Sequence, residues 1–173
     1  MGDRTYSFDV NNQLSDGAAS YTANGYAQFG GADGVVDLGG NQGATVTLPS
    51  IADVTTITPG QPRIDAVVVV DVTGGLFTGT TLFKLIVVMS NNPAFTAGTV
   101  QIAGMLEFGN AAGLDFINGI TTPAPSAVGG SRYEILFTNE QNNVKYQFLK
   151  LYNVIANSAT LTYKAFVAVL PRE

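Results

Sequence analysis

The chain has 173 residues, of which 46% are hydrophobic and only 12% charged, and its formal net charge is −5. It is long enough to bury a full core as one domain over residues 1–173, and its eight Lys and Arg residues, scattered singly, form no basic stripe for direct nucleic-acid binding. The absence of cysteine and histidine excludes disulfides, thiol chemistry and histidine-dependent triads, and it argues against structural zinc.

The low charge has two interpretations that the composition leaves open. Ser, Thr, Asn, Gln and 20 glycines replace the missing charges, which fits either a neutral polar surface or a surface covered by other subunits. The N-terminal Met1–Val10 is polar and lacks the apolar core of a signal peptide. The longest wholly apolar run, Ala165–Leu170, is far shorter than the ~20 residues that span a bilayer. We therefore expect a soluble protein made in the cytoplasm, with no membrane partner.

Short strands separated by glycine-rich turns are predicted in the first part of the chain. Apolar and polar residues alternate at Thr5–Val10, which is typical of a strand, and Val35–Leu38 is predicted as a short strand closed by Gly39–Gly43. Turn-forming residues dominate Asn11–Gly17 and Phe29–Gly34, and Ala18–Ala27 is ambiguous.

Two predicted strands in the middle of the chain, Arg63–Val72 and Thr81–Ser90, are apolar on both faces. We expect Gly74-Gly75 to end the first. An antiparallel sheet commonly presents one polar face to water, so both strands need a second cover. Either a segment of the same chain or a neighbouring subunit could supply it. The residues of the second face, our candidates for a subunit contact, are Val67, Val69, Leu82, Ile86 and Val88.

A further strand, Thr99–Phe108, precedes the longest predicted loop. In this strand we expect Val100, Ile102, Leu106 and Phe108 to point inward, with a bend or bulge at Gly104. The loop, Gly109–Ser131, contains five glycines and two prolines. Loops of this length are uncommon in compact domains and are often functional, so we expect an arm that reaches a neighbour, the alternative being a plain surface excursion. Its candidate contact residues are Leu114, Phe116 and Ile117.

The last forty residues predict three consecutive strands, Arg132–Thr138, Val144–Val154 and Ser158–Leu170. Their joints, Asn139–Asn143 and Ile155–Asn157, are short enough for hairpins between antiparallel neighbours. With no helix predicted, the whole pattern indicates an all-β fold, a jelly-roll β-sandwich of about eight to ten antiparallel strands.

No motif for catalysis or cofactor binding is found. Asp33 and Asp37 are close in sequence, but two separated aspartates do not supply the six to eight oxygens that calcium needs. The glycines do not form a phosphate-binding motif. A carboxylate pair of the glycosidase type could assemble only in space, and the strand carboxylates are more simply the wet ends of strands. Those carboxylates are Asp65, Asp71, Glu107 and Glu134. We therefore predict no enzyme, no cofactor and no metal.

Several short stretches, taken in order, resemble a known family. They are Phe8-Asp9, Leu14–Ala19, Val36–Gly39, Phe148–Val154 and Thr160–Val169. In this order the chain resembles the capsid cement (decoration) proteins of tailed bacteriophages, of the Bordetella-phage type. The resemblance implies a jelly-roll subunit that forms a dimer or trimer outside an HK97-like shell, bridges major capsid proteins and has no catalytic role.

The leading hypothesis is therefore a structural virion protein on the capsid exterior, assembled in the host cytoplasm. The candidate contact residues and the N-terminal Met1–Val10 would face other subunits or the shell. The main alternative is a carbohydrate-binding jelly-roll module of a phage tail or fibre, with Tyr21, Tyr26 or Phe116 lining a groove. A glycosidase is the third.

Overall fold

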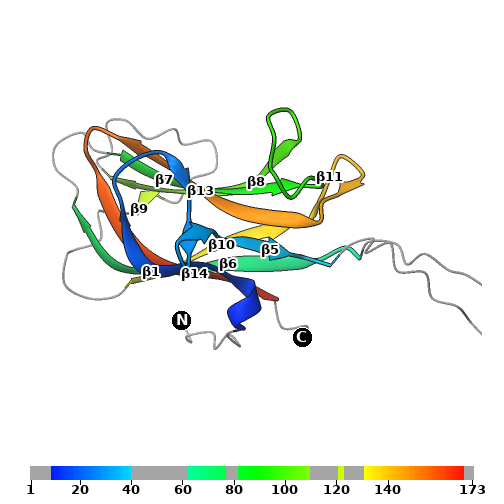
Figure 1. Cartoon of the computed structure of the whole chain (residues 1–173), viewed down its shortest axis with the longest axis horizontal. Helices are drawn as coiled ribbons and strands as arrows, with labels where there is room; N and C mark the ends of the chain where they lie inside the picture. Colours follow the sequence, from blue (N-terminus) through cyan, green and yellow to red (C-terminus); the bar gives the residue numbers. More distant parts are fainter. Residues whose placement is uncertain (1–8, 40–61, 77–81, 110–120, 123–130, 170–173) are drawn as a thin grey trace, which may run out of the picture.

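The computed structural model describes residues 9–39, 62–76, 82–109, 121–122 and 131–169. In this part of the chain nearly all regular structure is β-strand, and two sheets lie face to face (Figure 1). The single helix of the described residues is a 3-10 turn, η1 (Val10–Asn12), whose first turn is capped because Asp9 accepts a hydrogen bond from the backbone N–H of Asn11. The prediction of an all-β fold of antiparallel sheets is confirmed.

One sheet has four strands, and each pairs antiparallel with its neighbours. Their order across the sheet is β1 (Gln13–Tyr21), β14 (Thr160–Val169), β6 (Asp65–Leu76) and β10 (Ser131–Thr138). Val68, Val70 and Val72 on β6 and Tyr163 and Ala165 on β14 point into the core, as period-2 alternation requires.

The second sheet has six strands among the described residues. Their order is β2 (Gly25–Tyr26), β13 (Phe148–Ala156), β7 (Leu82–Ser90), β8 (Val100–Gly109) and β9 (Thr121–Thr122), with β5 (Val35–Asp37) also paired to β13. Among the strand pairs of the described residues, only β8 and β9 run parallel. Two short hairpins complete the described structure, β3 (Gln28–Phe29) with β4 (Ala32–Asp33) and β11 (Glu140–Gln141) with β12 (Val144–Lys145).

The C-terminal strands exist as predicted, but they are not neighbours. β10 and β14 belong to the four-stranded sheet, where β6 separates them, and β13 belongs to the other sheet, so none of these three strands pairs with another of them. The short joints instead carry the chain from one sheet to the other. Asn142-Asn143 and Asn157-Ser158 have positive φ angles between 52° and 61°, a conformation that asparagine tolerates better than most residues.

Three further predictions were wrong in detail. Asn11–Gly17, predicted as a turn, contains η1 and the first half of β1. Gly74-Gly75 does not end β6, which continues to Leu76 through a register shift opposite Thr162 and Tyr163. Val100 and Ile102 do not point inward, since they are 37% and 58% exposed.

A β-bulge explains the misplaced residues of β8. Val87 pairs with Gly104 and Val88 with Ile102, so Ala103 is an extra residue on β8. One extra residue reverses the alternation, so Leu106 and Phe108 face the core while Ile102 faces outward. Gly104 is needed there, because a Cβ would lie 2.8 Å from Ile135 Cγ2 and 3.2 Å from the Leu136 carbonyl oxygen.

A buried polar network connects the two sheets through the core. The Ser15 hydroxyl donates to the backbone carbonyl of Tyr163 at 2.8 Å and lies 2.9 Å from the Tyr21 hydroxyl. The Tyr163 hydroxyl donates to Asn153 Oδ1 on β13 at 2.6 Å. Ser15, Tyr163 and Asn153 are fully buried. Since unsatisfied buried polar groups are costly, these bonds fix the register of the two sheets relative to each other.

Candidate functional site

The candidate contact residues of β7 lie on the outer face of the six-stranded sheet. Leu82 and Ile86 are half-buried, and Val88 is 6% exposed. In register beside them, Ile86 lies between Met105 on β8 and Tyr152 on β13, and Val88 lies beside Ile102. We call this surface the outer apolar face: Ile86, Val88, Ile102, Met105, Tyr152 and Val154. Of these, Ile102 is the most open, at 58% exposure.

Val67 and Val69 lie on the outer face of the other sheet, and both are fully buried within the single chain. They form a small cluster of their own with Phe166 and Ala168 of β14. The second apolar face of β6 is therefore already covered within the chain at Val67 and Val69, and these two residues offer no accessible surface for a subunit contact. Leu136, which pairs with Val67, remains 61% exposed at the margin of this cluster.

The remaining candidate contacts fall outside the described residues. These are Leu114, Phe116 and Ile117, together with most of the Gly109–Ser131 loop and residues 1–8 of the N-terminal segment. Val10, the last residue of that segment, is 55% exposed in η1.

A row of alternating charges crosses the four-stranded sheet on its outer side. In register from β1 to β10 it runs Asp16, Lys164, Asp71 and Arg132. The Arg132 guanidinium donates to both carboxylate oxygens of Asp71, at 2.6 and 2.9 Å. Backbone N–H groups of Ala18 and Gly30 hold the pKa of Asp16 below its usual range. The outer side of the four-stranded sheet is therefore solvent-exposed and ion-paired along this row.

Two other strand carboxylates, Asp65 and Glu107, also lie beside basic side chains. Asp65 is 3.4 Å from Arg63, and Glu107, which is 2% exposed, is 2.7 Å from Lys84 Nζ. We therefore interpret Asp65 and Glu107 as ion-paired strand residues. Among the described residues, no group of three or more carboxylates could hold a metal ion.

Two of the three aromatic residues that the carbohydrate hypothesis named, Tyr21 and Tyr26, are packed against other residues of the fold. Tyr21 is 7% exposed, and its hydroxyl accepts a hydrogen bond from the backbone N–H of Gln28. Tyr26 packs edge-on against Tyr152 and Phe95, and burial raises its pKa. Phe116 is outside the described residues.

Lys150 forms a cluster that the sequence did not reveal. Its ammonium group lies 4.5 Å from the centre of the Tyr26 ring and 4.9 Å from that of Phe95, and 3.0 Å from Asp33 Oδ2. The residue is only 6% exposed. Phe95 reaches this place from the β7–β8 loop with a positive φ of 50°. Because these residues meet only through tertiary pairing, no sequence pattern could have indicated them. The Lys150 ammonium group makes cation–π contacts with both Tyr26 and Phe95, and these contacts anchor the β7–β8 loop on the sheet.

Comparison with family models, curated proteins and solved structures gives no match for this chain. The described residues include no helix with the length and apolar character needed to cross a membrane. Function therefore has to be inferred from the residues and their geometry.

Proposed function

We propose that this chain is a structural virion protein, a capsid cement protein that binds the outside of an HK97-like phage head and bridges major capsid subunits. The observation that carries the proposal is the outer apolar face. Ile86, Met105 and Tyr152 lie in one register row there, and Val88 and Ile102 in the next. Ile102 is exposed, Ile86, Met105, Tyr152 and Val154 are half-buried, and Val88 is buried beside Lys150. A sheet face in contact with water is normally polar, so apolar side chains that stay partly open on such a face favour an interaction site.

The strand order supports the jelly-roll architecture of this proposal. With β2 and β5 counted as one strand and the two-residue β9 left out, eight strands form the two sheets. Numbered along the chain, one sheet has the order 1-8-3-6 and the other 2-7-4-5. Two nested Greek keys produce such an order, and the resemblance of Leu14–Ala19 and Phe148–Val154 to cement proteins implies the same fold.

A cement protein needs many modest contacts, and the described surface suits that requirement. An oligomer that attaches at several points gains apparent affinity through effective concentration. The partners are then a second copy of the chain and the major capsid protein. The low charge of the sequence, at 12%, limits repulsion between copies packed side by side. Attachment from outside places the protein on the capsid exterior.

The proposal is tested with the purified full chain by light scattering, followed by co-sedimentation with heads that lack the protein. We expect a stable oligomer that pellets with the heads. A monomer that stays in the supernatant would overturn the proposal.

A matched pair of variants tests whether the outer apolar face is the surface that contacts other subunits or the head. Ile102→Thr changes a residue of the outer apolar face that is 58% exposed, and Val169→Thr changes one that is 67% exposed and not part of that face. Losing one buried isoleucine contact weakens assembly or head binding about tenfold, whereas Val169→Thr leaves both unchanged. If the two variants behave alike, the outer apolar face is not the contact. Deletion of residues 111–128 tests the predicted arm separately.

A further inference from the structure

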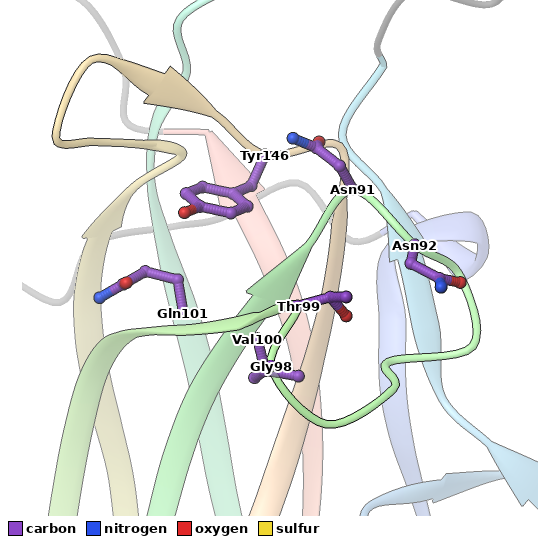
Figure 2. A pocket seen from close by; sticks show the side chains of 7 residues that line it. All are labelled: Asn91, Asn92, Gly98, Thr99, Val100, Gln101 and Tyr146. Atoms are coloured by element: carbon purple, nitrogen blue, oxygen red, sulfur yellow. The ribbon is translucent and has the colours of Figure 1, made fainter.

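A groove of ≈ 460 Å³ lies where the β7–β8 loop meets the start of β8 and the residues between β12 and β13 (Figure 2). Figure 2 shows Asn91 and Tyr146 on one side of it and Thr99, Val100 and Gly98 on the opposite side, with Gln101 and Asn92 at the two ends. All seven lining residues lie in the described part of the chain.

Hydrogen bonds within the chain hold the side chains that line the groove in place before any ligand binds. The Asn91 amide donates to the Lys145 carbonyl and accepts from the Gln147 backbone N–H, both at 2.9 Å, so it ties the loop to the strand beside it. Asn92 Oδ1 accepts from the backbone N–H of Ala94 at 2.9 Å, and the Thr99 hydroxyl donates to the Thr96 carbonyl at 2.8 Å. Locked side chains lose little entropy when a ligand binds.

The base of the loop is anchored as well. Phe95, 6% exposed, is packed against Tyr26 at 5.9 Å between ring centres and lies beside the Lys150 ammonium. Its positive φ of 50° is a conformation that phenylalanine adopts only where the surroundings enforce it. The loop is thus a rigid wall of the groove.

The lining is uncharged and rich in hydrogen-bonding groups. It contains three amide side chains, one threonine hydroxyl and one tyrosine, and no Asp, Glu, Lys or Arg. Among the described residues, the Tyr146 hydroxyl and the Gln101 side-chain carbonyl have no hydrogen-bond partner, while the Gln101 amide donates to Ile102 O at 3.2 Å. Both groups are free to bind a ligand.

The geometry points to a binding site for a neutral oligosaccharide. A sugar offers many hydroxyls that both donate and accept, which amide and hydroxyl side chains match, and an apolar C–H face that packs on an aromatic ring such as Tyr146. A phosphate or a carboxylate would find no cation in the lining, and an apolar ligand would leave the amides unpaired. This site does not depend on the proposed capsid function, and its lining includes neither Tyr21 nor Tyr26.

Saturation-transfer NMR on the full chain, with maltohexaose and chitotetraose as neutral probes and tetragalacturonate as an anionic one, tests the proposal. We expect a neutral probe to bind at millimolar concentration and the anionic probe to bind more weakly. Gln101→Ala and Tyr146→Phe each remove one free group and weaken binding roughly fivefold. Their matched controls are Gln28→Ala and Tyr152→Phe, which do not line the groove and leave binding unchanged.

The site is wrong if neither neutral probe binds, or if binding survives both groove variants or falls equally in the controls. Far-UV circular dichroism of each variant confirms that the fold is intact. Head co-sedimentation of the groove variants separates this site from the proposed function. Loss of sugar binding with retained head attachment is the expected result, and loss of both would show that the groove is part of the head contact and not a separate sugar site.

Discussion

The buried contact between Tyr163 and Asn153 gives the sharpest test of how the two sheets are held together. Tyr163→Phe removes only the hydroxyl that donates to Asn153 Oδ1 at 2.6 Å. Both residues are fully buried, and the other amide atom, Asn153 Nδ2, has no hydrogen-bond partner. The variant therefore leaves the whole buried amide unpaired. Such a loss costs about 1–3 kcal/mol. With a urea dependence of about 2 kcal/mol per molar, the unfolding midpoint falls by roughly 0.5–1.5 M.

Urea unfolding followed by far-UV circular dichroism measures this, since the chain has no tryptophan. Tyr152→Phe is the control, because its ring lies on the outer apolar face and its hydroxyl has no hydrogen bond among the described residues. Asn153→Leu alone is also expected to destabilise, by leaving the Tyr163 hydroxyl unpaired. The double variant should cost less than the sum of the two, since replacing both partners by apolar groups is nearly neutral. Additive costs, or a Tyr163→Phe midpoint equal to that of the control, would refute the reasoning.

Three further outcomes follow from the same structure. Burial raises the pKa of Tyr163 well above its ordinary value of 10.0. The stability that the neutral Tyr163 hydroxyl contributes is therefore complete below pH 10 and is lost as the pH rises above 10. When the pH is raised from below 10 to above 10, the free energy of unfolding should fall more for the wild type than for Tyr163→Phe. Gly34→Ala places a Cβ 2.1 Å from the Leu14 carbonyl oxygen and should cost about 1–3 kcal/mol, whereas Gly25→Ala, with nothing within 4 Å, should leave the thermal midpoint nearly unchanged. Asp33→Asn should cost about 1 kcal/mol by removing the carboxylate beside Lys150; a cost that does not shrink in high salt would contradict an electrostatic origin.

Local alternation predicted most strands well, because it depends only on which residues face the core. Tyr133, Ile135 and Phe137 point inward on β10, and Phe83, Leu85 and Val87 do so on β7, each at a spacing of two residues. The bulge at Gly104 was also anticipated. Pairing was not predictable, because Asn139–Asn143 and Ile155–Asn157 are as short as hairpin loops yet connect strands of different sheets. Loop length does not distinguish a hairpin from a crossing between sheets.

The accessibility of the candidate contact residues depends on contacts between segments that are distant in the sequence. Val67 and Val69 were correctly placed on a second apolar face, but the sequence could not say that this face is buried within the chain. Leu82, Ile86 and Val88 lie on the outer apolar face, where their neighbours come from β8 and β13. Neither the Lys150 cluster nor the groove has a local signature, since each gathers residues from segments that are more than forty positions apart.

A single extra residue connects the two surfaces on which the functional proposals depend. If β8 alternated regularly through Ala103, with no bulge, Val100 and Ile102 would face the core, as the sequence alone suggested. The bulge instead puts Ile102 on the outer apolar face and gives that face its most exposed side chain. The same reversal moves Gln101, which pairs with Met89, to the side where Tyr146 lies, and both residues line the groove. Since Gly104 alone allows β8 to approach Ile135 so closely, the glycine and the inserted alanine together create both the apolar contact surface and the polar groove at one edge of the sandwich.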